Sequence, residues 1–425
     1  MTATIPTLTR RYVVLNVLGW LPTGLCAPVL ILLLAARGID MATMGALLAA
    51  YGLTAAALEL PTGGLADVVG RRPVLIAASL LFLVSTISLG IGTGVLVLAA
   101  GILLEAAGRA LDSGPLQAWY VDAVHAVDED TDLTSAFAHG RTAGSIALAV
   151  GALAGGALAA LVPLPSAGPV LALSLPYLAA AGVIVVRIVV QLAWVGETVR
   201  RPRADLRAVL ADIPCTVRVG IDTCARVGVL RRITVLCGVI GVVLAAVELL
   251  APLQIAASLG GDSRAVGAFA VFTALGGFAM AAGSAASPTL TRLLGSVRRT
   301  VVLALVLTAV AVAALGTPML LVVAAGYVGV YLALGAPEPL LDTLTHRAAT
   351  AGERATVLSV QSLALRICGS VGALAAGVLA AHASATAVWV LVVAVLGLGA
   401  LVATGLPGHE PAATATEAGP VLEPA

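Results

Sequence analysis

Three ionisable residues share one face of a strongly apolar segment. Glu105, Arg109 and Asp112 are spaced i, i+4 and i+7, so in a helix they lie on the same side. Two carboxylates around one guanidinium leave one carboxylate without a full partner, and a desolvated carboxylate can exchange a proton near neutral pH. The spacing therefore predicts either a proton-exchange site or a structural ladder of ion pairs that holds this helix to its neighbours.

The amino-acid composition indicates whether such a helix is surrounded by water or by lipid. Of the 425 residues, 60% are hydrophobic and 11% are charged, whereas a soluble domain has about 25% charged residues. Mean hydropathy is +1.08, so most of the chain faces lipid. All 23 basic residues are arginines. Without a lysine the chain has no ordinary phosphate-binding loop, so uphill work must draw on an ion gradient or a partner. The net charge of +1 gives no sign of a nucleic-acid partner.

Twelve apolar segments are long enough to cross a membrane as helices, and they cover roughly residues 12–36, 42–66, 73–93, 95–122, 135–161, 168–193, 232–258, 264–290, 300–316, 318–344, 355–381 and 384–406. We therefore predict an all-α polytopic membrane protein with twelve transmembrane helices in two pseudo-symmetric six-helix bundles. The bundles are expected at 1–196 and 232–407, joined by a cytoplasmic central loop at 197–231 and followed by a disordered cytoplasmic tail at 408–425.

The arginines predict the orientation. With both termini in the cytoplasm, 18 of the 23 arginines lie at cytoplasmic ends or loops, and only Arg37 and Arg264 lie outside. Three more lie within helices: Arg109, Arg187 and Arg366. We expect a multi-pass protein of the cell (inner, or cytoplasmic) membrane. Arg187 is placed at the interfacial end of the sixth helix and left out of the site.

An internal repeat supports two related halves. Gly151–Ala160 matches Gly372–Ala381 at eight of ten positions, with an offset of 221 residues. His125 and His346 keep the same offset. Since both halves start on the same side, an axis along the membrane normal should relate them.

The loop after the second segment carries the most specific motif. Residues Gly63 to Arg72, Gly-Gly-Leu-Ala-Asp-Val-Val-Gly-Arg-Arg, fit the pattern GxxxDxxGRR. With this loop, twelve helices and parallel halves, the chain resembles the major facilitator superfamily. The Leu-Pro-Thr-Gly run before the loop resembles bacterial drug:proton antiporters.

The resemblance implies a role for this loop. In that superfamily it locks the outward-facing state through a charge cluster with the end of helix four. The residues expected to form this conformational latch are Gly63, Asp67, Gly70, Arg71, Arg72 and Asp122. The second-half counterpart, Thr291 to Arg299, has no acidic residue, so the latch there should be weaker.

Further candidates are charges in the membrane, where an ionised side chain costs about 3 kcal/mol. Arg109 matches the arginine of the superfamily's helix-four motif, which is tied to proton coupling. The proton-coupling candidates are therefore Glu59, Glu105, Arg109 and Asp112. Pairing with an arginine is the alternative for Glu59.

Helix seven lines the cavity in this superfamily, and Glu248 lies near its middle. The substrate-cavity candidates are Glu248, Arg366 as its counter-charge, Glu338 and Trp20. Glu338 lies between two prolines that break helix ten, so a gate hinge is equally expected for it.

Two transport functions stay open. Proton-coupled efflux (antiport) of small amphipathic or cationic organic compounds is favoured because the embedded acids outnumber the embedded arginines. The alternative is a proton symporter that imports a sugar or an organic acid, which more cationic and polar residues in the cavity would favour. A receptor or scaffold without transport is a minor alternative.

The remaining expectations concern partners. We expect a monomer whose partners are a small-molecule substrate, protons and the lipid bilayer. No HExxH, GxSxG or clustered His/Asp/Cys pattern occurs in the sequence, so no enzyme activity, catalytic residue or metal site is expected. The proton gradient takes the place of a cofactor.

Overall fold

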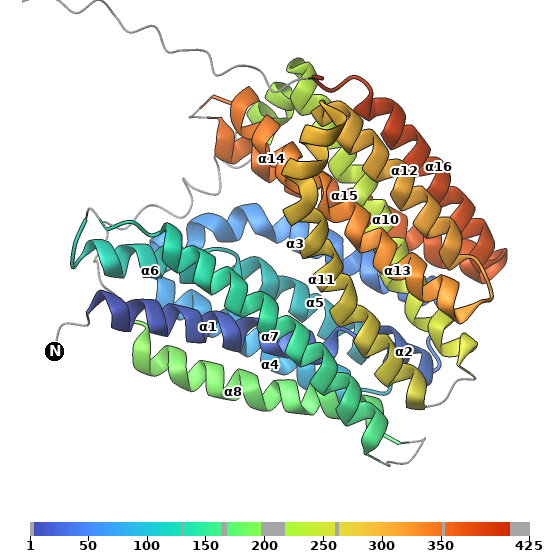
Figure 1. Ribbon diagram of the computed structural model, residues 1–425. Helices are drawn as coiled ribbons and strands as arrows, with labels where there is room; N and C mark the ends of the chain where they lie inside the picture. Colours follow the sequence, from blue (N-terminus) through green and yellow to red (C-terminus); the bar gives the residue numbers. More distant parts are fainter. Residues whose placement is uncertain are drawn as a thin grey trace, which may run out of the picture.

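The computed structural model describes residues 4–129, 131–162, 168–196, 217–259, 263–350 and 353–408. Within these ranges the secondary structure is helical, without strands (Figure 1). The elements of the first half are α1 (Ile5–Cys26), α2 (Leu30–Ala36), α3 (Met41–Val69), α4 (Arg71–Ile91), α5 (Val95–Asp112), α6 (Pro115–His125), α7 (Thr134–Leu161), the short η1 (Ala172–Ser174) and α8 (Leu175–Trp194). Those of the second half are α10 (Gly228–Ser258), α11 (Ser263–Leu294), α12 (Val297–Leu315), α13 (Leu320–Gly335), α14 (Pro337–Ala348), α15 (Arg354–His382) and α16 (Ala385–Ala403).

Eleven stretches in the described part of the chain are long and apolar enough to cross a membrane, with α1–α2 and α13–α14 each counted as one. The remaining span consists of α5 and α6, and its first part carries the three charged residues Glu105, Arg109 and Asp112. The predicted all-helical fold with twelve spans is therefore confirmed. Most of the central loop, and the tail from residue 409, lie outside the described residues.

The fourth span of each half is interrupted at a similar place. Between α5 and α6 the chain turns at Gly114, whose φ of 106° is readily adopted only by glycine, and Pro115 starts α6. Between α13 and α14 the break falls at Ala336, and Pro337 starts the new helix. Proline suits a first helical turn, because the N–H that it lacks would have no acceptor within the helix at that position. The predicted break in the tenth span is therefore confirmed.

The two halves meet along two helix pairs. Figure 1 shows α1–α8, coloured blue to green, and α10–α16, coloured yellow-green to red, as two groups that lean on each other. Across the interface α3 packs on α15, and α7 packs on α11. The two matching ten-residue repeats lie in α7 and α15, so they occupy equivalent places at this interface.

One end of the interface is closed by close backbone approach. A Cβ added to Gly45 of α3 would lie 2.9 Å from the Cα of Gly377 of α15, and one added to Gly156 of α7 would overlap Ala270 of α11. An apolar core that includes Leu34 of α2 and residues of α10 continues across this end. Small residues allow the helices of the two halves to approach this closely.

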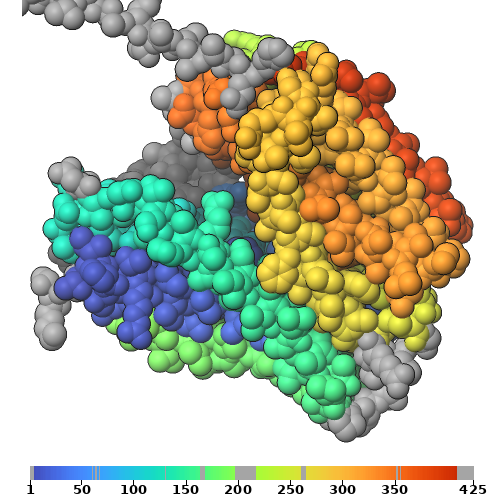
Figure 2. All heavy atoms as spheres, viewed as in Figure 1, coloured from blue at the N-terminus to red at the C-terminus, as the bar shows by residue number. Residues whose placement is uncertain are grey.

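The opposite end, which carries both described termini, is open. The space-filling view in Figure 2 shows a hollow between the first half and the second half on the side of α6 and α14. Among the described residues, the interior is therefore open at this end of the molecule and closed at the other.

Candidate functional site

A cavity of about 300 Å³ opens between the halves. Residues of α1, α5, α6, α8 and α15 and of the α5–α6 turn line it. Its polar and aromatic lining includes Asn16, Trp20, Arg109, Asp112, Gln117, Arg187 and Arg366. The expected placement of Trp20 and Arg366 in a central cavity agrees with this lining.

Asp112 pairs with an arginine that sequence reasoning set aside. The Arg187 Nη2 atom of α8 lies 2.5 Å from Asp112 Oδ1, and the Arg187 side chain is only 3% exposed. The expectation that the sixth span ends near Arg187 was wrong, because α8 continues to Trp194. The sequence contained a sign of this pair. Glu105 and Asp112 flank a single arginine, so one of the two carboxylates needed a cation from another helix.

Arg109 forms no ion pair with a carboxylate among the described residues, and other contacts hold its side chain. Its Nη2 donates to Thr23 Oγ1 at 2.9 Å, and its guanidinium lies 5.3 Å from the ring centres of Trp20 and Phe82. Both rings provide cation–π contacts. Thr23 and Trp20 belong to α1 and Phe82 to α4, so Arg109 joins three helices of the first half.

Glu105 faces a smaller pocket beside Arg109. This pocket holds about 30 Å³ and is also lined by Thr23, Cys26 and Tyr177, so it has room for about one water molecule. Glu105 and Arg109 interact electrostatically, but the carboxylate has no hydrogen bond or ion pair among the described residues. Glu105 and Asp112 thus face two different spaces, and the predicted single cluster is divided between them.

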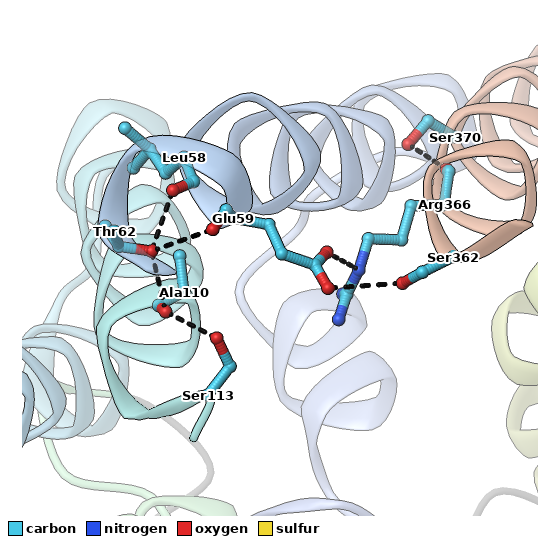
Figure 3. Close-up of polar contacts among 8 residues, drawn as sticks. All are labelled: Leu58, Glu59, Thr62, Ala110, Ser113, Ser362, Arg366 and Ser370. Atoms are coloured by element: carbon cyan, nitrogen blue, oxygen red, sulfur yellow. Dashed lines mark hydrogen bonds and ion pairs between the residues drawn. The ribbon is translucent and has the colours of Figure 1, made fainter. Parts of the chain in front are cut away.

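Glu59 and Arg366 connect the halves. Arg366 Nε of α15 lies 2.8 Å from Glu59 Oε2 of α3, and Ser362 Oγ donates to Glu59 Oε1 at 3.2 Å (Figure 3). On the next turn of α3, Thr62 Oγ1 donates to Ala110 O at 2.9 Å, which fixes α3 to α5. The expectation that Arg366 is the counter-charge of Glu248 was therefore wrong. The alternative for Glu59, pairing with an arginine, is observed.

Glu248 lies far from both ends of α10. Its neighbours along the helix, Val247 and Leu249, are completely buried, whereas Glu248 itself is exposed. It lies deep among the helices and interacts electrostatically with Tyr327 and Tyr331 of α13. Its exposed surface therefore faces the space inside the bundle rather than lipid. Within the described ranges it has neither a hydrogen bond nor an ion pair.

Glu338 lies at the rim, in the first turn of α14, and its side chain is exposed. It interacts electrostatically with Asp342 on its own helix and with Arg141 of α7 in the other half. This position next to a helix break agrees with either role that the sequence left open, a binding residue or a gate hinge.

The motif loop lies at the open end. Gly70 separates α3 from α4 with a φ of 109°, and the Arg71 Nη2 atom lies 3.2 Å from Asp122 Oδ2 of α6. Arg72 Nη2 donates to Leu192 O of α8 at 2.7 Å. These bonds join helices of the same half. The surroundings of Gly63 and the side chain of Asp67 lie outside what the structure describes, so the predicted part of these two residues in the latch stays a prediction.

Among the described residues, no group of three or more His, Cys, Asp or Glu side chains could hold a metal ion. What the interior does contain is a polar cavity between two six-helix halves. The model of the family described as Major Facilitator Superfamily matches residues 13–335, more than half of the chain. The chain belongs to the Major Facilitator Superfamily.

Solved structures agree with this membership at the level of the fold. A mutant of the nucleoside transporter NupG superposes with a TM-score of 0.74 at 13% identity, covering 93% of this chain and 98% of that one. The peptide transporter POT in complex with sulfate has a TM-score of 0.71 at 15% identity, covering 93% of both chains. A bacterial homolog of the human lysosomal transporter Spinster, in an inward-facing and unoccupied conformation, has a TM-score of 0.71 at 15% identity and covers 94% and 96%. No curated protein matches the chain in sequence.

Membership of the superfamily fixes the general activity. The chain is a multi-pass membrane transporter of a small molecule and not an enzyme. Members of this superfamily generally need no cofactor. Two features of this member go beyond what the sequence predicted: the buried Asp112–Arg187 pair, and the bond between Glu59 and Arg366 across the halves.

Proposed function

We propose that this transporter is a proton-coupled antiporter that exports small cationic or amphipathic organic compounds. The observation that supports it best is the Glu248 carboxylate, exposed to the interior of the bundle and without a bonded partner in the described residues. An unpaired anion inside a membrane protein is expensive to retain and is a functional candidate by default. A positively charged substrate group would supply its missing partner, and Tyr327 and Tyr331 of α13 interact with the carboxylate electrostatically.

The pairing of the other interior charges supports this assignment. Two of the three interior arginines are held by carboxylates, Arg187 by Asp112 and Arg366 by Glu59. Arg109 has Glu105 beside it without an ion pair. Among the described residues, the interior carboxylates left without an ion pair are Glu105 and Glu248, against one unpaired arginine, Arg109, so the interior as a whole carries an excess of negative charge.

The conformation supports alternating access. The helix pairs α3–α15 and α7–α11 close one end, while the cavity opens at the end with both described termini. The arginine distribution places that end in the cytoplasm, so the structure corresponds to the state that would load substrate from inside the cell. Export then requires the two halves to rock about the central site.

Glu105 is the carboxylate that we propose to carry the coupled proton. Its pocket has room for about one water molecule, and protonation would remove a charge that interacts with Arg109. Arg109 reaches Thr23 and Trp20 of α1, so a change in its position reaches the substrate cavity directly. A membrane potential of 100 mV supplies about 2.3 kcal/mol per charge, or roughly a 50-fold substrate ratio.

The second candidate is proton-coupled uptake of a polar or anionic metabolite. It is favoured by the 300 Å³ cavity itself, which is lined by three arginines and by Asn16 and Gln117. Both candidates use the same fold and the same open state, and they differ in the sign of the substrate charge and in the direction of net transport.

Reconstitution into liposomes distinguishes the two candidates. The purified protein is incorporated with a pH-sensitive dye in the lumen, and cationic drugs, sugars and organic acids are added to one side in turn. Proton movement opposite to a cationic compound supports the antiporter, and movement together with an anionic or polar metabolite supports the symporter. Substrate flux that follows a sodium gradient but moves no protons would contradict both proposals.

A further inference from the structure

A second groove lies on the outer surface of the second half, away from the central cavity. It holds about 370 Å³ between the first turn of α10 and the end of α16. Two arginines, Arg231 and Arg232, line it together with Val235, Leu401, Val402 and Thr404. Basic groups therefore occupy the end of the groove at the helix termini, and apolar groups extend along the helices.

The two guanidinium groups are not used by the described protein. Among the described residues, the side chains of Arg231 and Arg232 have no hydrogen bond and no ion pair. This differs from Arg299 at the start of α12, which donates to Leu294 O at 3.2 Å. Two adjacent positive charges without acceptors favour an anion that can bind both of them.

The groove also depends on a glycine. A Cβ added to Gly405, just after α16, would overlap the guanidinium of Arg232. The absence of a side chain at this position lets Arg232 lie against the end of α16. The arginine is therefore seated in the groove by the shape of the backbone, although no described carboxylate holds it.

The apolar walls face outward. Val235 is 43% exposed and Leu401 is 69% exposed, and both belong to helices that are long and apolar enough to span the membrane. Such surfaces face lipid acyl chains. An occupant of this groove would therefore have its anionic group beside the arginines and its apolar part against Val235 and Leu401.

We propose that this groove between α10 and α16 binds an anionic phospholipid, whose phosphate lies between Arg231 and Arg232 and whose acyl chain follows Val235 and Leu401. Basic pockets between transmembrane helices at the membrane surface are suited to such headgroups. The first half has a related groove at Arg72, lined by Ile76 and Leu80, but Arg72 donates to Leu192 O at 2.7 Å. The lipid site of the second half is therefore the one with guanidinium groups available, and it is independent of the transported substrate.

Lipid titration with native mass spectrometry tests the proposal. The purified protein in detergent is titrated with phosphatidylglycerol and, separately, with phosphatidylcholine. We expect tighter retention of phosphatidylglycerol by the wild type. The double variant Arg231→Gln/Arg232→Gln should lose this preference and bind phosphatidylglycerol about 30-fold more weakly, which corresponds to about 1 kcal/mol for each arginine.

Two matched variants separate a site from a general charge effect. Arg298→Gln/Arg299→Gln removes the same charge from the same end of the same half and should keep the preference. Gly405→Ala removes no charge but displaces Arg232, and it should weaken binding several-fold. Thermal unfolding of each variant checks that it is folded.

Three results would overturn the proposal. One is equal retention of the two lipids by the wild type. Another is an equal loss of binding in the two double variants, which would indicate surface charge alone. The third is displacement of the lipid by free glycerol phosphate at the concentration at which the lipid itself binds, which would indicate a site for a soluble anion.

Discussion

The interiors of the two halves carry different charged residues on a similar order of helices. In the first half, Glu105, Arg109, Asp112 and Arg187 gather on α5 and α8 around two neighbouring spaces. In the second half, the acid deep in α10 is Glu248, and Arg366 of α15 is bound to Glu59 of the first half. The duplicated fold thus carries two kinds of chemistry. The first half holds the Asp112–Arg187 pair beside Arg109 and Glu105, to which we assign the proton, and the second presents a carboxylate without a bonded partner among the described residues, to which we assign the substrate.

The motif loops show the same difference. Arg71 of the first half pairs with Asp122 of α6. The equivalent loop of the second half has no acidic residue, and its Arg299 donates to the Leu294 carbonyl of its own turn. Pseudo-symmetry therefore predicts where a loop lies but not what its side chains bind.

The largest expected effect comes from breaking the buried pair of the first half. Asp112→Asn removes the anion beside Arg187, whose side chain is 3% exposed, and a buried charge without its partner costs about 3 kcal/mol or more. We expect a clear drop in the unfolding temperature of the purified protein in detergent. The double variant Asp112→Asn/Arg187→Gln should recover much of that loss. An Asp112→Asn protein as stable as the wild type would show that water in the cavity already screens Arg187.

Glu248→Gln is the matched test in the second half. Because this carboxylate has no bonded partner in the described structure, the substitution should leave the unfolding temperature almost unchanged. It should reduce transport of a cationic substrate about tenfold or more, since a hydrogen bond to a charged group contributes roughly 1.5–3 kcal/mol. Uptake into proteoliposomes measures this, with Asp342→Asn as a control acid on α14. Unchanged transport would remove Glu248 from the substrate site.

The sequence was sufficient for the spans, the break before Pro337 and the contact between Arg71 and Asp122. The spans follow from apolar runs and the break from a residue without an N–H, whereas the contact between Arg71 and Asp122 was expected from the resemblance to the superfamily. The partners of Arg187 and Arg366 could not be predicted in this way. Periodicity shows which face of one helix a charge occupies, but the helix opposite that face is set by packing between distant segments. For Arg366 that partner is Glu59, which lies 307 positions earlier in the chain.

The ion pair between Glu59 and Arg366 joins the two halves. Removing it should change the ratio between the observed conformation and the one in which the closed end is open. Glu59→Gln weakens the contact between α3 and α15 in the observed state, while the other end of the bundle is unaffected. A loss of about 1 kcal/mol shifts the ratio of the two states roughly fivefold toward opening of the closed end. Spin labels at Asp40 and His382, on the two halves at that end, measure the change as a longer distance.

The control for this experiment is Glu338→Gln, which removes an acid from the opposite, open end. It should leave the distance between the two labels unchanged. An equal change in both variants would mean that net charge, rather than the bond between the halves, determines the conformation.

The smallest expected effect concerns the motif loop. Asp122→Asn removes a pair whose side chains are 16% and 22% exposed, and pairs this accessible contribute at most about 1 kcal/mol. Stability should therefore fall only slightly, whereas transport should fall several-fold if the Arg71–Asp122 contact stabilises one state of the cycle. Asp342→Asn, the related position on α14, should change neither, because among the described residues Asp342 has no ion pair with the second-half loop, whose Arg299 donates to Leu294 O instead. Equal effects at Asp122 and Asp342 would mean that both loops act alike, and the asymmetry between the halves would then be confined to their interior charges.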